Sequence, residues 1–542
     1  MAFLRTDKKK SGTYLRIVRS YRGEDGKNRH QTLYNLGKAE DYSIETLKKM
    51  GQTLYELGGG TLEDLQRRMF HEIASYYYGF VQVVAQLLAI YGLDRFFDNI
   101  SRNKSLGFNL SDCVNLLICE RLHDPVSKYS NFINQRDYFG LDKMKLHQIY
   151  RALDHLSDNQ ETIKRMIYNK GRNLFNQKLD VVFYDVTTFY FNSSKEDGFR
   201  EKGFGKDGGI GDTIILFGML IDQNKQPVGY EVYRGKKYEG HTFADSIKRL
   251  KEKYQIEKVI CVADAGMMNK TNRAEVEQAD YEYIFGERLK NLSKAIQHEI
   301  LDISKYAPLT IEDPDTGEKV NLRYYVTGYQ GRKLLTTYSQ KRAAKDKAER
   351  EEKIEKAKKM LQNPEQLAKK AKSYYLKKEG QNVYSLDEEK IKRSEKFDGF
   401  MTIATNNRQI SNEQIVTAYK QLYKIEQCYR SFKTFLETRP MFHWTEKRIL
   451  GHLALCYIAF TLLNFLQLSL RKRNTPLSEN KIRKALIYMQ LRLVSQNDKE
   501  YYSRSNTPED AMKILKALKI KQIPDLTPRE AINQYFKQVK KE

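Results

Sequence analysis

Cysteine is scarce in this sequence, and its five residues are scattered. They form no CxxC pair and no Cys/His cluster with the spacing of a zinc site: Cys113, Cys119, Cys261, Cys428 and Cys456. This pattern is atypical of a disulfide-stabilised secreted protein and fits reduced thiols in a cytoplasm. The first residues are polar and basic and contain no apolar stretch, so we expect no secretory signal.

Glycine and proline are also few, with 31 and 10 residues in a chain of 542. This content is far too low for a fibrous or low-complexity protein. Hydrophobic residues make up 40% of the chain and aromatic residues 12%, which excludes a disordered chain. The length suggests about three or four domains and is sufficient for at least one large core.

Only one stretch, residues 449–470, is apolar enough to resemble a membrane span. It contains His452, Asn464 and Gln467. Because these polar side chains interrupt the stretch, we expect a buried core helix here rather than a membrane helix.

Positive charge, by contrast, is abundant. Lys and Arg number 94 against 69 Asp and Glu, which gives a formal net charge of +25. A surplus of this size indicates a polyanionic partner, and nucleic acid is the first interpretation. An anionic membrane surface and a soluble protein that is simply basic remain as alternatives.

The hydrophobic periodicity changes several times along the chain. Residues 13–36 predict two strands around a turn, and residues 43–175 have the three- and four-residue spacing of helices. Residues 179–287 predict the order β-β-β-α-β-α-β, which is an α/β sheet with an antiparallel start. A charged stretch at 301–397 interrupts this pattern, and a strand and a long helix capped by Ser411 follow it.

Two aspartates stand out in the predicted sheet. Asp185 interrupts the apolar strand LDVVFYDVTTFYF, which tolerates a carboxylate only where another group offsets its charge. Asp264 follows the apolar segment VICVA, at the strand end where open α/β sheets bind their ligands. Two aspartates on neighbouring strands can share hard cations such as Mg²⁺. For either residue alone, a capping or ion-pairing role is an equally good interpretation.

The helix that follows Ser411 carries two distinct stripes, since each residue turns it by about 100°. One stripe is polar and aromatic: Tyr419, Tyr423, Glu426, Arg430 and Lys433. The other is apolar: Leu422, Ile425, Tyr429 and Phe432. The apolar stripe can pack on the sheet and leave a carboxylate flanked by cations at the edge, which suits a site for metal and phosphate. Salt bridging on a surface helix is the alternative.

Asp185, Asp264 and Glu426 together resemble the DDE triad of transposases with a ribonuclease H-like catalytic domain. Tyr419, Glu426 and Lys433 also match the spacing of the Y-x2-R-x3-E-x6-K signature of a superfamily of bacterial insertion-sequence transposases. The chain departs from this signature at Leu422, where the family has an arginine. Arg430, on the polar stripe, is a candidate replacement for that cation.

Further segments are similar to one branch of that superfamily, and the resemblance extends over most of residues 10–470. They include YLRIVRSYR, GKNR, LYNLGK, GFGKDGG, PVGYEVYRG and RPMFHWTEKRILGHLALCYIAF. Another is RLHDPVSK at 121–128, in which Pro125 predicts a helix boundary.

The resemblance implies an α/β ribonuclease H-like catalytic core that is interrupted by an insertion domain. A small N-terminal β unit and helical N- and C-terminal regions would flank this core. The expected regions are an N-terminal β-hairpin and linker (1–70), a helical DNA-binding or dimerisation region (71–175), the first part of the core (176–300), the insertion domain (301–397), the last core strand and catalytic helix (398–470), and a C-terminal helical region (471–542).

The implied activity is metal-dependent cleavage of DNA at insertion-sequence ends, followed by strand transfer into target DNA. The resemblance implies two Mg²⁺ or Mn²⁺ ions held by the three carboxylates. It further implies that Lys433 and Arg430 bind phosphate near the cleaved end, and that Tyr419 or Tyr423 stacks on a base. His241, just before a helix, is a possible further site residue.

The implied partners are double-stranded DNA, as terminal inverted repeats and as target, and a second copy of the chain in a homodimer. We expect a bacterial cytoplasmic protein that associates with the nucleoid and not with a membrane. Two alternatives remain: a metal-dependent nuclease or resolvase on the same fold, and a catalytically inactive DNA-binding descendant of a transposase. His443 and His452 are ambiguous between site and structural roles.

Overall fold

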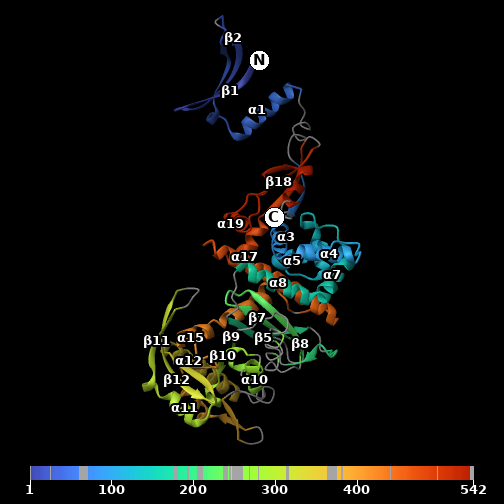
Figure 1. Cartoon of the computed structure of the whole chain (residues 1–542). Coiled ribbons are helices and arrows are strands. Elements are labelled where there is room, and N and C mark those ends of the chain that lie inside the picture. The colour runs from blue at the N-terminus through green and yellow to red at the C-terminus, as the bar shows by residue number, and fades with distance from the viewer. Residues whose placement is uncertain are drawn as a thin grey trace. The chain divides into compact units, whose positions relative to one another are not determined.

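The computed structural model describes most of the chain (Figure 1). The described residues are 2–24, 26–59, 71–175, 181–191, 195–203, 212–235, 242, 246, 249, 260–267, 269–278, 280–312, 317–362, 375–379, 383–439, 441–496 and 499–537. They form a mixed α/β protein with two compact units. The smaller unit comprises Met1–Ser75, Arg492–Ser503 and Asp525–Ala531, and the larger comprises Tyr76–Leu491, Arg504–Pro524 and Ile532–Glu542.

The smaller unit begins with an antiparallel sheet of three strands and a helix. These are β1 (Ala2–Lys9), β2 (Gly12–Arg22), β3 (Asn28–Lys38) and α1 (Ile44–Leu57). The sequence predicted the last two strands, and the structure adds β1 as a third. Ser43 begins α1, because its side chain accepts a hydrogen bond from the backbone N–H of Thr46 at 3.1 Å.

A second sheet has the order β19-β18-β17-β4. Its strands are β4 (His71–Tyr77), β17 (Gln490–Gln496), β18 (Lys499–Arg504) and β19 (Leu526–Pro528). The regions 71–175 and 471–542, expected as helical, thus also contain these strands. In β17, buried Leu491 and Leu493 flank exposed Arg492, which is the two-residue period of a strand.

The larger unit contains the helical region that the spacing of apolar residues predicted. Its helices are α3 (Gly79–Tyr91), α4 (Leu93–Asn103), α5 (Leu110–His123), α6 (Lys128–Asn134), α7 (Leu146–Asp158) and α8 (Gln160–Phe175). The boundary expected at Pro125 is confirmed, since α5 ends before it and α6 begins after it. Ser127 caps α6 by accepting a hydrogen bond from the N–H of Ser130 at 3.0 Å.

The main sheet has the order β11-β12-β13-β16-β10-β9-β5-β7-β6, with β8 on β7. Its strands between residues 181 and 287 are β5 (Val181–Phe191), β6 (Glu201–Lys202), β7 (Thr213–Asp222), β8 (Pro227–Arg234), β9 (Ile260–Ala263) and β10 (Glu282–Glu287). The pairs β5–β7 and β7–β8 are antiparallel, whereas β5–β9 and β9–β10 are parallel. The predicted α/β sheet with an antiparallel start is confirmed. The short helix α10 (Lys270–Gln278) connects β9 to β10.

The stretch 301–397, expected as an insertion, begins by extending this sheet. Its sheet strands are β11 (Ala307–Glu312), β12 (Lys319–Tyr329) and β13 (Arg332–Tyr338), and β13 pairs with β16 (Phe400–Thr405). The rest of the stretch contains α12 (Gln340–Leu361), β14 (Leu376–Lys378), β15 (Tyr384–Leu386) and α14 (Glu388–Glu395), and α11 (Lys294–Leu301) precedes it. The main sheet therefore continues past residue 301, where the insertion was expected to begin.

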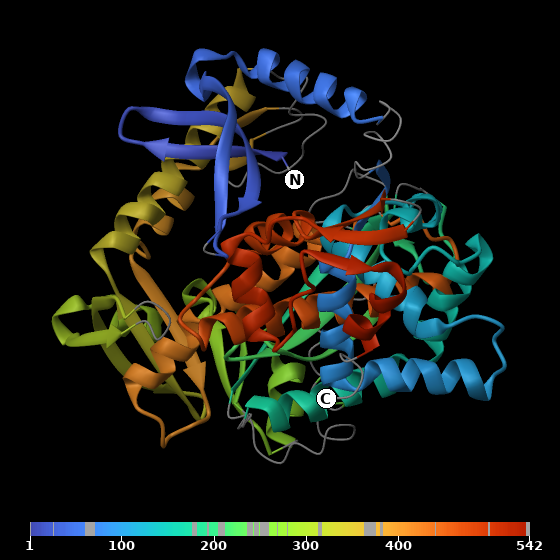
Figure 2. The same ribbon diagram turned by 90° about the horizontal axis from the view of Figure 1, so that it is seen from above.

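The remaining helices follow β16 in the chain. They are α15 (Asn412–Lys420), α16 (Tyr423–Arg430), a π-helical turn (Ser431–Phe435), α17 (Glu446–Arg471), α18 (Glu479–Ile487), α19 (Glu509–Ala517) and α20 (Asn533–Lys537). In the larger unit, helix α8 and its neighbours lie beside the strands of the main sheet in both views (Figures 1 and 2).

Helix α17 is the central core helix of the larger unit. By length and composition it could cross a membrane, but 94% of its most apolar window is buried by the rest of the protein. A Cβ atom at Gly451 would lie 2.0 Å from the carbonyl oxygen of Leu153 in α7. The close packing of α17 on α7 therefore requires glycine at position 451. The ring of Tyr457 packs 4.7 Å from that of Tyr230 in β8. The expectation of a buried core helix is confirmed.

Candidate active site

The structure brings the two predicted aspartates onto adjacent parallel strands. The register of β5 and β9 pairs Val182 with Cys261 and Phe183 with Val262. Continued by two residues, the same register sets Asp185 opposite Asp264. Residues opposite each other on neighbouring strands lie about 5 Å apart and face the same side of the sheet. By this extrapolation of the register, the two aspartates lie at the same edge of the sheet, just beyond the carboxyl end of β9.

Asp185 is the point at which a buried strand opens toward solvent. From Val181 to Phe189 it is the one residue of β5 that is not fully buried. Its carboxylate accepts a hydrogen bond from the backbone N–H of Val186 at 2.7 Å. The preceding residue, Tyr184, is buried, and its hydroxyl donates to the hydroxyl of Thr242 at 2.9 Å. Strand packing thus fixes the backbone on both sides of this carboxylate.

Asp264 is exposed at the end of its strand and is held by Tyr419 of α15. The hydroxyl of Tyr419 donates a hydrogen bond to the Asp264 carboxylate. Burial, followed by the negative charge of Asp264, raises the pKa of Tyr419 above its usual range, so the hydroxyl keeps its proton. The sequence placed Tyr419 on the polar stripe of its helix but did not predict its contact with Asp264.

Gly286 of β10 makes room for that contact, and sequence reasoning missed it. A Cβ atom at Gly286 would lie 2.3 Å from the hydroxyl of Tyr419 and 2.9 Å from the backbone nitrogen of Ala265. Real Cβ atoms do not approach other atoms this closely. The signal in the sequence was a lone glycine inside an apolar strand, which often marks a close approach of another group.

The helix predicted after Ser411 begins as expected but is not continuous. The Ser411 side chain accepts a hydrogen bond from the N–H of Gln414 at 3.1 Å, as a capping residue does. The helix is interrupted at residues 421–422 by tighter turns, in which the N–H of Ile425 donates to the carbonyl oxygen of Leu422 at 3.1 Å. After α16 it widens into the π-helical turn that contains Lys433. The prediction of one continuous helix is therefore wrong.

The interrupted helix keeps part of the apolar stripe and part of the polar stripe that the sequence predicted. On the apolar stripe, Ile425, Tyr429 and Phe432 are buried, and Leu422 at the interruption is half-buried. On the polar stripe, the exposed positions are Glu426 and Arg430, and the half-buried ones are Tyr419, Tyr423 and Lys433. The carboxylate of Glu426 thus reaches solvent on a helix whose other face packs on the sheet.

Tyr429 attaches this helix to the strand of Asp185. Its hydroxyl donates to the backbone carbonyl oxygen of Asp185 at 2.5 Å and accepts from the backbone N–H of Met219 at 3.0 Å. Burial is the main cause of a strongly raised pKa for Tyr429, so the hydroxyl remains a donor. Glu426 lies three residues before Tyr429 on the same helix, so this contact also fixes its backbone relative to the strand. The sequence predicted Tyr429 only as an apolar residue, although a buried tyrosine hydroxyl usually needs a partner.

The three carboxylates offer the oxygen ligands that a hard divalent cation prefers. Asp185 and Asp264 form the ready pair, and Tyr429 docks the helix of Glu426 onto the strand of Asp185. Within the part of the chain that the structure describes, no three His, Cys, Asp or Glu side chains are close enough to hold a metal ion. The residues present fit a divalent ion, provided that the exposed Glu426 side chain moves toward the pair.

Of the three predicted histidines, the structure describes His443 and His452. His241 lies outside the described residues. His443 and His452 lie together elsewhere in the larger unit, with ring centroids 5.0 Å apart.

Comparison with known proteins gives two family matches. Residues 176–462 match the transposase DDE domain, and residues 4–62 match the N-terminal domain of IS1634 family transposases. No curated protein is similar enough to count as a match. Among solved structures, the chain is similar to the piggyBac transposase synaptic complex with hairpin DNA, with 10% identity, 70% of each chain covered and a TM-score of 0.37.

Two structures of Mos1 transposase are more distant. The paired-end complex with the left transposon end has 10% identity over 32% of this chain and 57% of that chain, with a TM-score of 0.15. The Mos1 mariner paired-end complex with Mn has 13% identity over 30% of this chain and 54% of that chain, with a TM-score of 0.14. The match thus spans little more than half the length of the Mos1 chains.

Proposed function

Because the chain belongs to the insertion-sequence DDE transposases, enzymes that act on DNA by cleavage and strand transfer, we propose that Asp185, Asp264 and Glu426 are its catalytic carboxylates. The observation that carries this assignment is the register of β5 and β9, which sets the two aspartates opposite each other. The contact of Tyr429 with Asp185 supports the third member, since it docks the helix of Glu426 on the same strand.

In this proposal the three carboxylates bind two Mg²⁺ or Mn²⁺ ions. When bound, such a pair supplies Lewis-acid activation of the attacking water or DNA 3′-hydroxyl and stabilises the leaving oxygen. The carboxylates themselves contribute fixed negative oxygen ligands on a rigid strand and a docked helix. Tyr419 keeps the carboxylate of Asp264 oriented through its hydrogen bond.

The cations and the remaining tyrosine on the polar stripe act on the DNA. Arg430 and Lys433 offset the charge that gathers on the phosphate during in-line attack. Tyr419 contacts Asp264, and Tyr423, half-buried on the same stripe, is a second candidate to stack on a base. Leu422 occupies the signature position of the arginine and lies at the helix interruption. Arg430 is exposed on the polar stripe and would supply the positive charge in its place.

The larger organisation follows from the family and the charge. We propose a ribonuclease H-like core formed by β5–β10 and β16, with the stretch 301–397 as the insertion. Residues 1–70 and this insertion would bind the terminal inverted repeats, and 71–175 would contribute to a homodimer that also holds target DNA. The protein would act in the bacterial cytoplasm at the nucleoid. The net charge of +25 supports extensive phosphate contacts.

The test is an end-cleavage and strand-transfer assay. Purified protein is incubated with labelled DNA from the ends that flank its gene, a target plasmid, and Mg²⁺ or Mn²⁺. We expect cleavage at the end and joining to the plasmid by the wild type, and loss of both in Asp185→Asn, Asp264→Asn and Glu426→Gln. Glu413→Gln is the matched control, since Glu413 is exposed on α15.

The outcomes separate the candidate functions. Cleavage without joining would indicate a nuclease or resolvase, and tight DNA binding without cleavage would indicate an inactive descendant. Retention of cleavage by any one of the three carboxylate variants would remove that residue from the catalytic set.

A further inference from the structure

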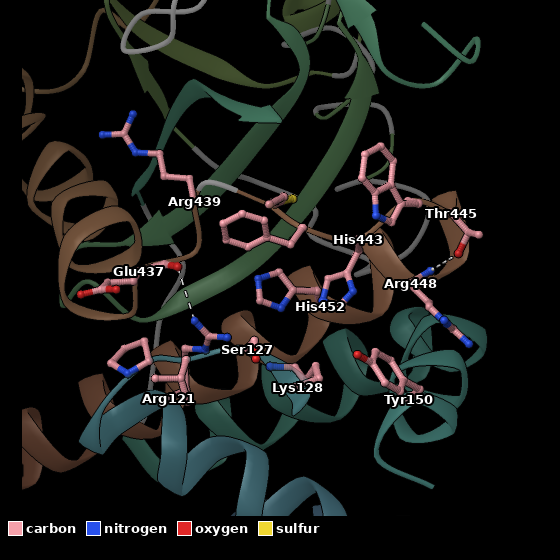
Figure 3. Close-up of a pocket in the computed structure, with 15 residues that line it drawn as sticks. Arg121, Ser127, Lys128, Tyr150, Glu437, Arg439, His443, Thr445, Arg448 and His452 are labelled. Atoms are coloured by element: carbon pink, nitrogen blue, oxygen red, sulfur yellow. Dashed lines mark hydrogen bonds between the residues drawn. The ribbon is translucent and has the colours of Figure 1, made fainter. Parts of the chain in front are cut away.

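A cavity of about 380 Å³ joins two segments that the catalytic proposal leaves without a role (Figure 3). One wall is formed by the segment RLHDPVSK, which connects α5 to α6. The opposite wall is formed by Glu437, Arg439 and residues 441–445, which lead from the π-helical turn toward α17, and by Arg448 and His452 of α17. The two segments lie more than 300 residues apart in the sequence, and both were noted as similar to one transposase branch.

The cavity is lined mainly by positive charge. Its lining includes Arg121, Lys128, Arg439 and Arg448, and among its described lining residues the only carboxylate is that of Glu437. Arg121 is buried, and its guanidinium donates to the backbone carbonyl oxygens of Leu436 and Glu437 at 3.1 and 3.3 Å. These neutral acceptors hold the guanidinium in place without cancelling its charge.

Lys128 is the most unusual of these cations, because only 4% of it is exposed. Its ammonium group can donate three hydrogen bonds, and one goes to the side-chain oxygen of Asn131 at 3.1 Å. Burial, followed by the charge of Arg121, lowers its pKa to about 7. Glu120, one of the groups that act on Lys128, accepts hydrogen bonds from Asn131 and Asn134 at 2.7 and 3.2 Å. A buried ammonium with donors to spare favours an anionic ligand.

His452 is a further buried group, and its Nε2 atom lies 3.7 Å from the Sγ atom of Cys456. It is 5% exposed, and within the described chain its Nδ1 atom has no hydrogen-bond partner. Its neighbour in the cavity is His443, whose ring lies 5.0 Å away (Figure 3). Burial lowers the pKa of both histidines, which keeps the rings neutral and able to donate one N–H each.

Exposed aromatic rings surround the cations. Trp444 is 63% exposed and Phe442 is 67% exposed, and both line the cavity. The guanidinium of Arg200 lies 5.3 Å from the centre of the Trp444 ring, and that of Arg448 lies 5.0 Å from the ring of Tyr150. Solvent-exposed aromatic rings beside arginines are typical of surfaces that bind single-stranded or unpaired nucleotides.

The cavity is also connected to the strand that carries Asp185. The backbone N–H of Met441, which lines the cavity, donates to the carbonyl oxygen of Tyr190 in β5 at 3.3 Å. Tyr190 lies five residues beyond Asp185 on this strand, which corresponds to about 16 Å. One DNA molecule can therefore reach both places.

We propose that this cavity binds a phosphate group of the DNA substrate through Lys128, Arg448 and the buried His452, while Trp444 stacks on an adjoining base. This inference goes beyond the catalytic assignment, because it does not require that the three carboxylates are catalytic. A free phosphate has the same chemistry as a DNA phosphate, so the experiment must distinguish the two sources.

The test uses Trp444, which is the sole tryptophan of the chain. The full-length protein is titrated in metal-free buffer with EDTA, at constant ionic strength, and tryptophan fluorescence is recorded. The probes are a six-nucleotide DNA single strand, inorganic phosphate, and sodium chloride as the control anion. We expect saturable quenching by the oligonucleotide, its displacement by inorganic phosphate, and no response to chloride.

Two variants probe the lining. Lys128→Met and Arg448→Gln each remove a charged donor, and we expect each to weaken oligonucleotide binding about tenfold or more. Arg448 is partly exposed, and its Nε atom forms an ion pair with Asp154 at 3.6 Å. Its variant therefore provides the binding measurement if Lys128→Met fails to fold. Lys143→Met is the matched control, because Lys143 is exposed and does not line the cavity.

Each other result overturns the proposal. An unchanged Trp444 signal in the presence of oligonucleotide, or equal binding by all variants, would show that the cavity does not bind DNA. Saturation by inorganic phosphate that oligonucleotide does not displace would assign the cavity to a free anion instead. Because no metal is present, loss of catalysis in the carboxylate variants has no bearing on these readings.

Discussion

The hydroxyl of Tyr429 lies 2.5 Å from the backbone carbonyl oxygen of Asp185, a residue 244 positions earlier in the chain. The same hydroxyl accepts a hydrogen bond from the N–H of Met219 in β7. One side chain of α16 therefore contacts two neighbouring strands of the sheet. The position of α16, and with it that of Glu426, relative to the strand of Asp185 depends on this contact.

Tyr429→Phe tests this contact directly. The substitution keeps the ring but leaves a buried carbonyl oxygen and a buried N–H without their partner. We expect a loss of about 1–3 kcal/mol in the free energy of unfolding and slower DNA cleavage, because α16 is less firmly docked. Thermal unfolding and end cleavage measure the two effects. Tyr488→Phe, on an exposed ring, is the control. An unfolding temperature equal to that of the control would contradict the role of the hydroxyl.

Gly286→Ala tests the packing of Tyr419 against the turn after β9. The added methyl group would collide with the Tyr419 hydroxyl and with the backbone of Ala265. Relief of the collision must displace Asp264 or Tyr419, so we expect about 1–3 kcal/mol of destabilisation together with reduced cleavage. Gly328→Ala in β12 adds the same methyl group where no atom lies within 4 Å. Equal activity of the two variants would argue against a positioning role for Tyr419.

Lys128 predicts a characteristic dependence of stability on pH. Its pKa is about 7 in the folded chain against an ordinary value of 10.5, so between these values the unfolded chain binds the extra proton. Stability of the wild type therefore rises with pH across this window, and Lys128→Met lacks this contribution. We expect Lys128→Met to be more stable than the wild type near pH 7, and the difference to vanish near pH 10.5.

Thermal unfolding of both proteins at several pH values measures this difference, with Lys143→Met as the control. The other charged or titratable groups that act on Lys128 are Arg121, which is permanently charged, Cys456 and Glu120. His443 and His452 have lowered pKa values and stay neutral throughout the window. A difference that is constant between pH 7 and pH 10.5 would contradict the lowered pKa of Lys128.

The ion pair of Arg332 and Glu287 tests whether β13 belongs to the core sheet. Both side chains are about nine-tenths buried, and they join the end of β10 to the start of β13. Arg332→Met leaves a buried carboxylate without its cation, and we expect a loss of about 3–5 kcal/mol. The double variant Arg332→Met, Glu287→Met should recover most of this loss in chemical denaturation. Additive effects of the two changes would show that the pair is not coupled.

The sequence was sufficient to predict the strands of Asp185 and Asp264 and their adjacency. Each aspartate interrupts or ends a run of apolar residues, and such runs have few structural alternatives. The capping role of Ser411 was also predictable, because capping depends on residues three positions apart. The predictions that held in detail therefore rest on local patterns.

Contacts between distant segments were beyond the reach of local patterns. The partner of Tyr429 is a backbone carbonyl group, which every residue possesses, so no residue type indicates it. The interruption after Tyr419 follows from packing rather than from a proline or glycine, and the sequence there is helical throughout. Strands β11–β13 are polar enough on one face to resemble an inserted segment, although they extend the core sheet.

Helix α17 has a consequence for how the chain can be divided. The DDE domain match begins at residue 176 and ends at residue 462, inside α17. Yet this helix crosses α7 at Gly451 at backbone contact distance, and it packs Tyr457 against β8 of the sheet. A fragment trimmed to the match would lack residues 463–471 of α17 and the whole of α7. We therefore expect a fragment of residues 176–462 to be less stable than the full chain, which thermal unfolding of both would show.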